Sequence, residues 1–230
     1  MLHSPTPSLL VHQKNKISNE LSLTDKLILE FDHALKTLVP GTTKANRPSP
    51  SDEVINNKEL SDPEKKHIIG LMRINHCGEV CAQALYQGQA ITSSSESIKN
   101  SMQESAKEEE DHLAWCEQRL EELDGHVSLL NPIFYSLSFG LGVVTGLAGD
   151  KWSLGFIGAT EDQVCEHLRH HLDQIPDHDK KTRAILSKML EDEEEHGEKA
   201  MGQGGIEFNK KIKKFMTSTS KIMTKATYKI

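Results

Sequence analysis

A lone glutamate followed by a Glu-x-x-His pair occurs twice along this chain, and this repeat constrains the fold more than any other feature. The residues of the two copies are Glu79, Glu109 and His112 in the first, and Glu161, Glu193 and His196 in the second. The copies are 82 positions apart at the lone glutamate and 84 at the histidine. Residues three positions apart share one face of a helix, so each pair can contact one ion if its segment is helical.

Almost the whole chain has the periodicity of helices, because apolar residues recur at intervals of three and four. Helices are expected at about 22–38, 61–91, 96–124 and 179–201, and another passes through Glu161. The runs TSSSES and IPDHDK mark turns, and VPGTTKANRPSPSD is a linker by its proline, glycine and serine content. The sequence therefore predicts an all-α fold.

The turns place the parts of each copy at the same height. A helix rises about 1.5 Å per residue, so residues equidistant from the turn of an antiparallel hairpin lie level. The midpoint of Glu79 and Glu109 is Ser94 in the serine run, and the corresponding midpoint of the second copy is Asp177. Two such hairpins predict a four-helix bundle in which six ligands converge, the pattern of di-iron carboxylate proteins.

Two further Glu-x-x-His pairs, Glu30/His33 and Glu64/His67, have no partner glutamate across a turn. Glu64 lies three residues after Ser61 at the start of a helix, where the two residues can form a capping box. We interpret both pairs as helix surface, because such pairs are usually neighbours on a solvated face.

Several polar residues beside the six are candidates for supporting roles. Asp192 and Glu108, each directly before a glutamate of the repeat, could orient a histidine of the other half. His76, three residues before Glu79, is a candidate for an extra ligand or for a hydrogen-bond partner, and we keep it outside the six. Glu110 and Asp111 are interpreted as helix surface or as support of the site.

The charge distribution excludes some functions. A formal net charge of −7 argues against nucleic-acid binding. Seven lysines and no acid follow from Lys210 onward, which suits either a soluble helix face or a surface against anionic lipid.

The N-terminus lacks the features of a secretory signal, which predicts a cytoplasmic chain. The four cysteines include no Cys-x-x-Cys pair, and we interpret them as buried thiols.

Residues 132–149, PIFYSLSFGLGVVTGLAG, form an uncharged stretch of 18 residues. The stretch has the minimum length of a membrane span, but it is rich in glycine and serine and is followed at once by Asp150 and Lys151. A buried core helix is one interpretation. We favour a segment that enters one leaflet of a membrane, with Trp152 and Tyr135 as interfacial anchors.

Five stretches together resemble the bacterial Coq7-type demethoxyubiquinone hydroxylases, which are membrane-associated di-iron monooxygenases of ubiquinone biosynthesis. The stretches are LMRINHCGEVCAQALYQGQA, EEEDHLAWCEQRL, SLLNPIFYSLSFGLGVVTGLAGD, SLGFIGATEDQVCEHL and EDEEEHGEKA. The resemblance runs from about Leu21 to Ile230, and its iron ligands match the six residues of the repeat. Leu168 follows His167 where eukaryotic members have a tyrosine, so a role for that tyrosine does not carry over.

The resemblance implies that the chain hydroxylates the benzoquinol ring of a polyprenylated demethoxyubiquinol, with two iron ions, dioxygen and an external reductant for which NADH is a candidate. It also implies a peripheral position on the cytoplasmic side of the inner membrane. Other ubiquinone-biosynthesis proteins and a second copy of the chain are candidate partners.

The expected division of the chain has three parts: an amphipathic helix and linker (1–60), a ferritin-like di-iron domain (61–205) with a membrane-associated segment (131–160), and a basic C-terminal helix (206–230). Two alternatives stay open. A ferritin-like protein that stores iron or reduces peroxide would share the ligand pattern but would not turn over a demethoxyquinol. A metal-free lipid-binding scaffold of the biosynthetic complex would leave quinone synthesis intact in Glu109→Ala.

Overall fold

The computed structural model describes residues 22–56 and 58–230, and every regular element in this part of the chain is a helix. The helices are α2 (Leu23–Leu38), α3 (Asp62–Thr92), α4 (Glu96–Glu122), α5 (Asn131–Leu147), α6 (Asp150–Gln174), α7 (Lys180–Gly202) and α8 (Lys210–Thr227). The predicted all-α fold is confirmed. Contacts divide the chain into residues 1–36, whose described part lies in α2, and residues 37–230, which contain the bundle.

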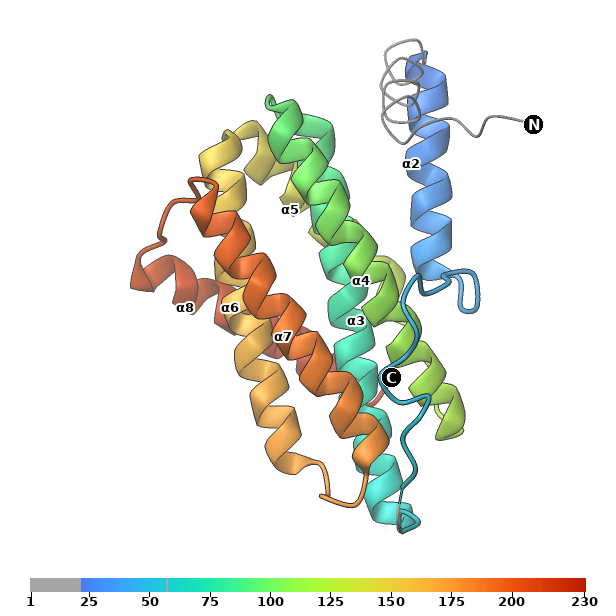
Figure 1. Ribbon diagram of the computed structural model, residues 1–230. Helices are drawn as coiled ribbons and strands as arrows, with labels where there is room; N and C mark the ends of the chain where they lie inside the picture. The colour runs from blue at the N-terminus through green and yellow to red at the C-terminus, as the bar shows by residue number, and fades with distance from the viewer. Residues whose placement is uncertain (1–21, 57) are drawn as a thin grey trace, which may run out of the picture. The chain divides into compact units, whose positions relative to one another are not determined.

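The bundle consists of two helical hairpins. Helix α3 pairs with α4, α6 pairs with α7, and contacts between α4 and α7 and between α3 and α6 join the hairpins (Figure 1). Ser95 caps α4, because its Oγ accepts a hydrogen bond from the backbone nitrogen of Ile98 at 3.4 Å. Asp179 caps α7 in the same way, through the backbone nitrogen of Thr182 at 3.3 Å. Both turns therefore lie where the spacing of the repeat predicts them.

Two apolar layers fill the bundle at different heights. Each of the four bundle helices contributes to both layers. The larger layer includes Ile68, Met72, Trp115, Leu120, Leu168, Ile185 and Met189, and the smaller one includes Ala82, Tyr86, Met102, Leu154, Ile157 and Ala200. Glu79 lies between Met72 and Ala82 along α3, so the polar residues of the repeat are enclosed between two apolar layers.

The uncharged stretch forms one helix and the turn that follows it. It forms α5, turns at Gly149 with a φ of 107°, and is followed directly by α6. Helix α5 approaches α3 so closely that a Cβ on Gly142 would lie 2.4 Å from the carbonyl oxygen of Leu85. Tyr135 is 6% exposed and donates a hydrogen bond to Gln87, so its predicted role as an interfacial anchor is wrong. None of the described helices combines the length and apolarity needed to cross a membrane.

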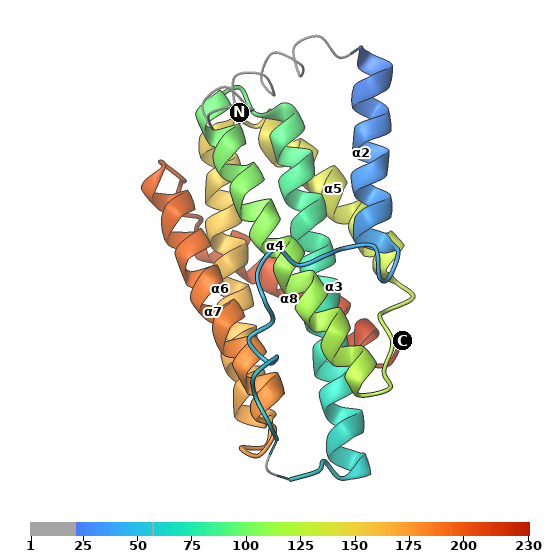
Figure 2. The ribbon, with the colours of Figure 1, turned by 45° about the vertical axis from the view of Figure 1, so that its right-hand side comes forward.

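Helices α5 and α8 both contact α3 and α6, on the side of the bundle away from α4 and α7 (Figure 2). The linker, which we define as residues 39–61, is not helical where it is described, as expected. It nevertheless packs against α4. The backbone nitrogen of Gly41 donates to Glu117 Oε1 at 2.7 Å, and Gln118 Nε2 donates to Asp52 Oδ1 at 3.2 Å.

Candidate metal centre

The four bundle helices bring the six residues of the repeat together. Helix α3 contributes one glutamate, α6 another, and α4 and α7 each contribute a glutamate and a histidine: Glu79, Glu161, Glu109, His112, Glu193 and His196. All six are at most 4% exposed. Glutamate and histidine so deeply buried need compensating partners, because an isolated charge in the core is costly.

The six residues form two overlapping groups of metal-ligating atoms. In each group the four atoms lie within 4.8 Å of one another. The first group contains Glu79, Glu109, His112 and Glu193, and the second contains Glu109, Glu161, Glu193 and His196. Each group thus has its own histidine and its own glutamate, and both share Glu109 and Glu193. This is the arrangement that two neighbouring metal ions bridged by two carboxylates require.

Both histidines turn the same ring nitrogen toward the carboxylates. His112 Nδ1 lies 3.3 Å from Glu109 Oε2 and 3.2 Å from Glu193 Oε1. His196 Nδ1 lies 3.1 Å from Glu109 Oε1 and 3.4 Å from Glu193 Oε2. Each of the two shared glutamates therefore places one carboxylate oxygen near His112 and the other near His196.

The other ring nitrogens contact carboxylates from the opposite hairpin, as the sequence predicts. His112 Nε2 lies 2.9 Å from Asp192 Oδ2, and His196 Nε2 lies 2.5 Å from Glu108 Oε2. A carboxylate on the outer nitrogen of a metal-binding histidine fixes the orientation of the ring and leaves the inner nitrogen free to bind. Asp192 and Glu108 therefore hold Nδ1 of both rings toward the centre.

Electrostatics make this cluster a favourable place for cations. Burial and the carboxylate of Glu109 raise the pKa of Glu79, and burial and the carboxylates of Glu193 and Glu109 raise the pKa of Glu161. Burial alone would lower the pKa of His196, but its contacts with Glu109 and Glu193 raise it to about 12. The carboxylates thus favour positive charge among them, whether protons or metal ions supply it.

Eight buried side-chain atoms of the described residues lack a hydrogen-bond partner, and three of them belong to the cluster: Glu109 Oε1, Glu193 Oε2 and His196 Nδ1. Unsatisfied buried acceptors are rare in folded proteins, and a bound metal ion is one of their ordinary explanations. Carboxylate oxygens and imidazole nitrogens suit Fe²⁺ among the divalent metals. The residues present therefore fit a pair of iron ions.

Three supporting residues were not predicted in these roles. Tyr86 is buried and donates a hydrogen bond from its hydroxyl to Glu161 Oε1 at 2.9 Å. Arg47 of the linker lies with Nε 2.6 Å from Asp111 Oδ2 and with Nη1 2.9 Å from Asp192 Oδ2. The indole nitrogen of Trp115 donates to the carbonyl oxygen of Arg47 at 3.4 Å. The sequence could have drawn attention to Arg47, because it is the only arginine in the predicted linker, but the sequence does not indicate which carboxylates Arg47 contacts.

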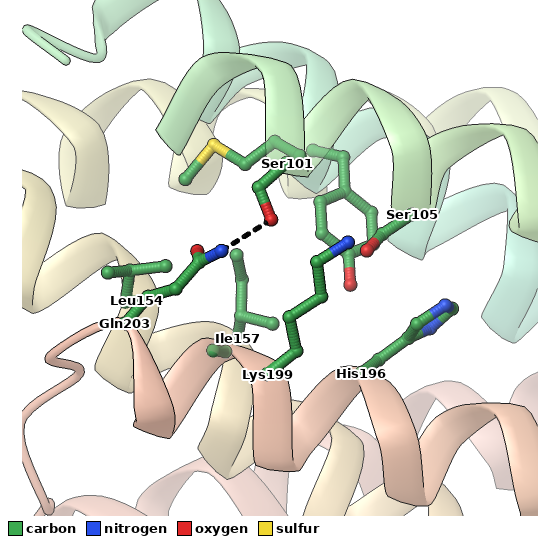
Figure 3. Close-up of a pocket in the computed structure, with 10 residues that line it drawn as sticks. Ser101, Ser105, Leu154, Ile157, His196, Lys199 and Gln203 are labelled. Carbon is green, nitrogen blue, oxygen red and sulfur yellow. Dashed lines mark hydrogen bonds between the residues drawn. The ribbon is translucent and has the colours of Figure 1, made fainter. Parts of the chain in front are cut away.

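Two cavities reach the cluster from outside. A cleft of about 420 Å³ between α6 and α7 is lined by Glu161 and Glu193, with Asp162, Arg169 and Glu194 among its other residues. A smaller cavity, drawn in Figure 3, ends at His196 and has Tyr86 in its wall, and at its far end Gln203 Nε2 donates to Ser101 Oγ at 2.9 Å.

Two further histidines, the candidate His76 and His167, lie outside the cluster. His76 is buried with Nδ1 3.3 Å from the Asn131 amide nitrogen, and His167 Nε2 lies 3.2 Å from Ser220 Oγ on α8. Among the rejected pairs, His67 Nδ1 contacts the hydroxyl of Tyr228 at 2.8 Å, at the end of α8.

The rejected glutamates also follow the prediction. Glu64 accepts hydrogen bonds from the backbone nitrogen and the hydroxyl of Ser61, at 2.8 and 2.6 Å, in the predicted cap. Glu30 and His33 lie 4.0 Å apart on α2, and the His33 side chain is 51% exposed. All four cysteines are free, and Cys77, Cys116 and Cys165 are buried as expected, whereas Cys81 is only partly buried.

Comparison with known proteins gives a family. The family model described as "Ubiquinone biosynthesis protein COQ7" matches residues 66–227. A protein named 3-demethoxyubiquinol 3-hydroxylase from Ectopseudomonas mendocina is 55% identical over 211 residues, which cover 92% of this chain and 98% of the relative. Relatives with the same name from Stutzerimonas stutzeri and Pseudomonas syringae are 54% and 52% identical, over 91% and 92% of this chain and 97% and 98% of their own lengths. The chain therefore belongs to the Coq7 family of ubiquinone biosynthesis proteins.

Proposed function

We propose that this chain is a di-iron monooxygenase that hydroxylates the benzoquinol ring of a polyprenylated demethoxyubiquinol. The observation that carries the proposal is the pair of overlapping ligand groups, which share two buried glutamates. The reaction replaces one ring hydrogen by a hydroxyl group. One oxygen atom of dioxygen enters the ring, and the other leaves as water after taking two electrons from an external reductant, with NADH as the candidate, and two protons.

In this proposal Glu79 and His112 would hold one iron, Glu161 and His196 would hold the other, and Glu109 and Glu193 would serve both. The two ferrous ions would activate dioxygen and pass on the two electrons that the external reductant replaces. Other side chains of the protein hold the ligands in position through hydrogen bonds and ion pairs. Asp192 and Glu108 hold the outer nitrogens of the histidines, and the Tyr86 hydroxyl holds one oxygen of Glu161.

We further propose that the outer face of α5 rests on the membrane that contains the substrate. Its side chains Ile133, Leu137, Val144 and Leu147 are 57–72% exposed, and their spacing places them in one row. A continuous exposed apolar row on a helix is typical of an interaction surface. An enzyme resting there, on the cytoplasmic side of the cell membrane, could act on the quinol ring while the polyprenyl tail stays among the lipids.

The test is anaerobic loading with ferrous iron, followed by dioxygen and a short-tailed demethoxyquinol. We expect about two iron ions per chain, a hydroxylated product, and labelled oxygen in that product when labelled dioxygen is used. Absence of both the two-iron stoichiometry and the product would exclude the proposal.

The same experiment separates the alternatives. Uptake of many iron ions per chain, or peroxide consumption without hydroxylated quinol, would favour a storage or peroxide-reducing protein. A metal-free lipid-binding scaffold predicts that Glu109→Ala folds normally and that quinone synthesis continues in cells that carry it. Loss of synthesis in that variant would exclude the scaffold.

A further inference from the structure

The two halves of the metal centre are built alike but supported differently. In each half, the outer nitrogen of the histidine contacts the acidic residue that directly precedes a shared glutamate, Asp192 for His112 and Glu108 for His196. The side chain of Asp192 is 5% exposed, whereas that of Glu108 is 47% exposed. Equivalent positions of the repeat thus place a buried carboxylate beside His112 and a solvent-exposed carboxylate beside His196.

Arg47 increases this difference, because its guanidinium contacts two carboxylates and an aromatic ring. Its Nε lies 2.6 Å from Asp111 Oδ2, its Nη1 lies 2.9 Å from Asp192 Oδ2, and its central carbon lies 4.9 Å from the ring centre of Trp115. Asp111 Oδ1 also accepts hydrogen bonds from the backbone nitrogens of Asn46 and Arg47, at 2.5 and 3.3 Å. A planar guanidinium fixed in this way can hold a carboxylate in one orientation.

Glu108 has no such support. Within residues 22–56 and 58–230, its one ion pair is the contact with His196. Both cavities also reach this half of the centre, since the α6–α7 cleft is lined by Glu161 and the smaller cavity by His196. Neither of them is lined by Glu79 or His112.

We propose that Arg47 is a positioning residue, which acts through Asp192 on His112 and makes the Glu79–His112 half the tighter and more slowly exchanging of the two metal positions. This inference rests on the metal centre proposed above. A buried carboxylate that cannot rotate keeps Nδ1 of the ring aimed at its metal, and such supporting residues commonly change metal affinity by about 10- to 100-fold. The half at His196 relies on an exposed carboxylate and opens to the cavities, so its ion exchanges faster.

The test is a chelator challenge of protein loaded anaerobically with ferrous iron. We expect iron to leave the wild-type chain in two phases of equal size. Arg47→Gln should accelerate the slow phase by about 10- to 100-fold and leave the fast phase unchanged, and Arg47→Lys should restore only part of the difference. Mössbauer spectra of the loaded Arg47→Gln variant should change in one iron signal and not in the other.

Ligand variants assign the two phases to the two halves. His112→Ala should remove the slow phase, because it removes the inner nitrogen of the supported half. His196→Ala should remove the fast phase for the same reason in the other half. The opposite assignment would overturn the proposal.

Two matched controls separate positioning by Arg47 from simpler effects. Lys188→Ala removes a second cation on Asp192, whose Oδ1 lies 3.0 Å from Lys188 Nζ on the exposed side. Glu117→Gln weakens the anchor of the linker at Gly41 without touching Arg47. Both controls should leave the slow phase unchanged, and an acceleration equal to that of Arg47→Gln in either one would overturn the proposal.

The outcomes also distinguish this inference from the proposed function. Release of two wild-type ions in one phase would overturn the inequality of the two halves and leave the metal centre standing. Failure of the wild-type chain to bind ferrous iron at all would instead overturn the proposed function.

Discussion

At the scale of single residues, position in the bundle distinguishes glutamates that spacing alone makes equivalent. Glu193 belongs to both ligand groups, whereas Glu64 caps the first turn of α3 by accepting two hydrogen bonds from Ser61. We expect Glu193→Ala to abolish turnover and two-iron binding. Glu64→Ala should keep both and lower the unfolding free energy only slightly, because the partner of Ser61 in the cap is lost. Iron analysis, product formation and denaturant unfolding measure the three quantities, and equal loss of turnover in both variants would contradict the assignment.

The pKa values of the two histidines give a second prediction at this scale. Burial opposes protonation of His112, but Asp192, Glu109 and Glu193 raise its pKa well above the ordinary value, and the pKa of His196 is raised to about 12. The raised pKa values favour the protonated imidazoles in the absence of metal, and each must lose a proton from Nδ1 to bind an ion. We expect iron binding to release protons from the histidines and from Glu79 and Glu161, whose pKa values are also raised, and to weaken as the pH falls.

Calorimetric titration with ferrous iron under anaerobic conditions, in two buffers with different ionisation enthalpies, measures the released protons directly. The variant Glu64→Ala serves as a control, because it leaves the cluster untouched. A binding heat that does not depend on the buffer, together with an affinity that does not change with pH, would contradict the protonated state of the imidazoles.

The sequence allowed the six clustered residues to be predicted, because their spacing is local and each turn fixes the height of two helices. Arg47 could not be predicted in the same way. Composition shows that residues 39–61 are not helical, but it does not show which carboxylate Arg47 meets some 64 positions later in the chain. The same limit applies to Tyr86. In the sequence it is indistinguishable from an ordinary core residue, and only the packing of α3 on α6 brings its hydroxyl to Glu161.

At the scale of elements, helix ends could be predicted wherever a side-chain cap or a turn sequence marked them, as at Ser95 and Asp179. The structure of the uncharged stretch could not be predicted in this way. Its composition allows a core helix as well as the membrane-associated segment that we favoured, and one side of α5 is buried while the other is exposed. Tyr135 faces inward and is buried, whereas Leu137, two residues later, is 65% exposed. Only the position of α3 decides which side of α5 is covered.

Close packing of α5 on α3 gives a prediction with a matched control on the same helix. A Cβ on Gly142 would lie 2.4 Å from the carbonyl oxygen of Leu85, whereas a Cβ on Gly140 would meet nothing within 4 Å. We expect Gly142→Ala to lower the unfolding free energy by about 1–3 kcal/mol through overpacking. Gly140→Ala should raise it by up to about 1 kcal/mol, because alanine is the better helix former. Denaturant unfolding followed by circular dichroism measures both, and equal effects would contradict the close approach.

At the scale of the whole bundle, the side covered by the linker differs from the side covered by α5 and α8. The linker covers part of α4, while α5 and α8 cover α3 and α6 on the other side and carry exposed apolar side chains outward. On α8, Phe215 and Ile222 are 73% and 71% exposed, and lysines occupy the same helix. Apolar side chains next to lysines are the combination that binds anionic lipid surfaces. The metal centre lies between these two faces, and neither cavity that reaches it is lined by a residue of α5 or α8.

Binding to lipid vesicles tests whether α5 forms the membrane face. We expect the double variant Leu137→Glu/Val144→Glu to bind vesicles of phosphatidylethanolamine and phosphatidylglycerol at least about tenfold more weakly than wild type, because burial of each apolar side chain contributes about 1.5–3 kcal/mol. Ile55→Glu is the matched control, since Ile55 is 81% exposed in the linker, away from α5 and α8. Vesicle sedimentation measures the binding, and iron content confirms that each variant keeps its centre. If the double variant binds as tightly as wild type, or if Ile55→Glu loses as much binding, the membrane face is not α5.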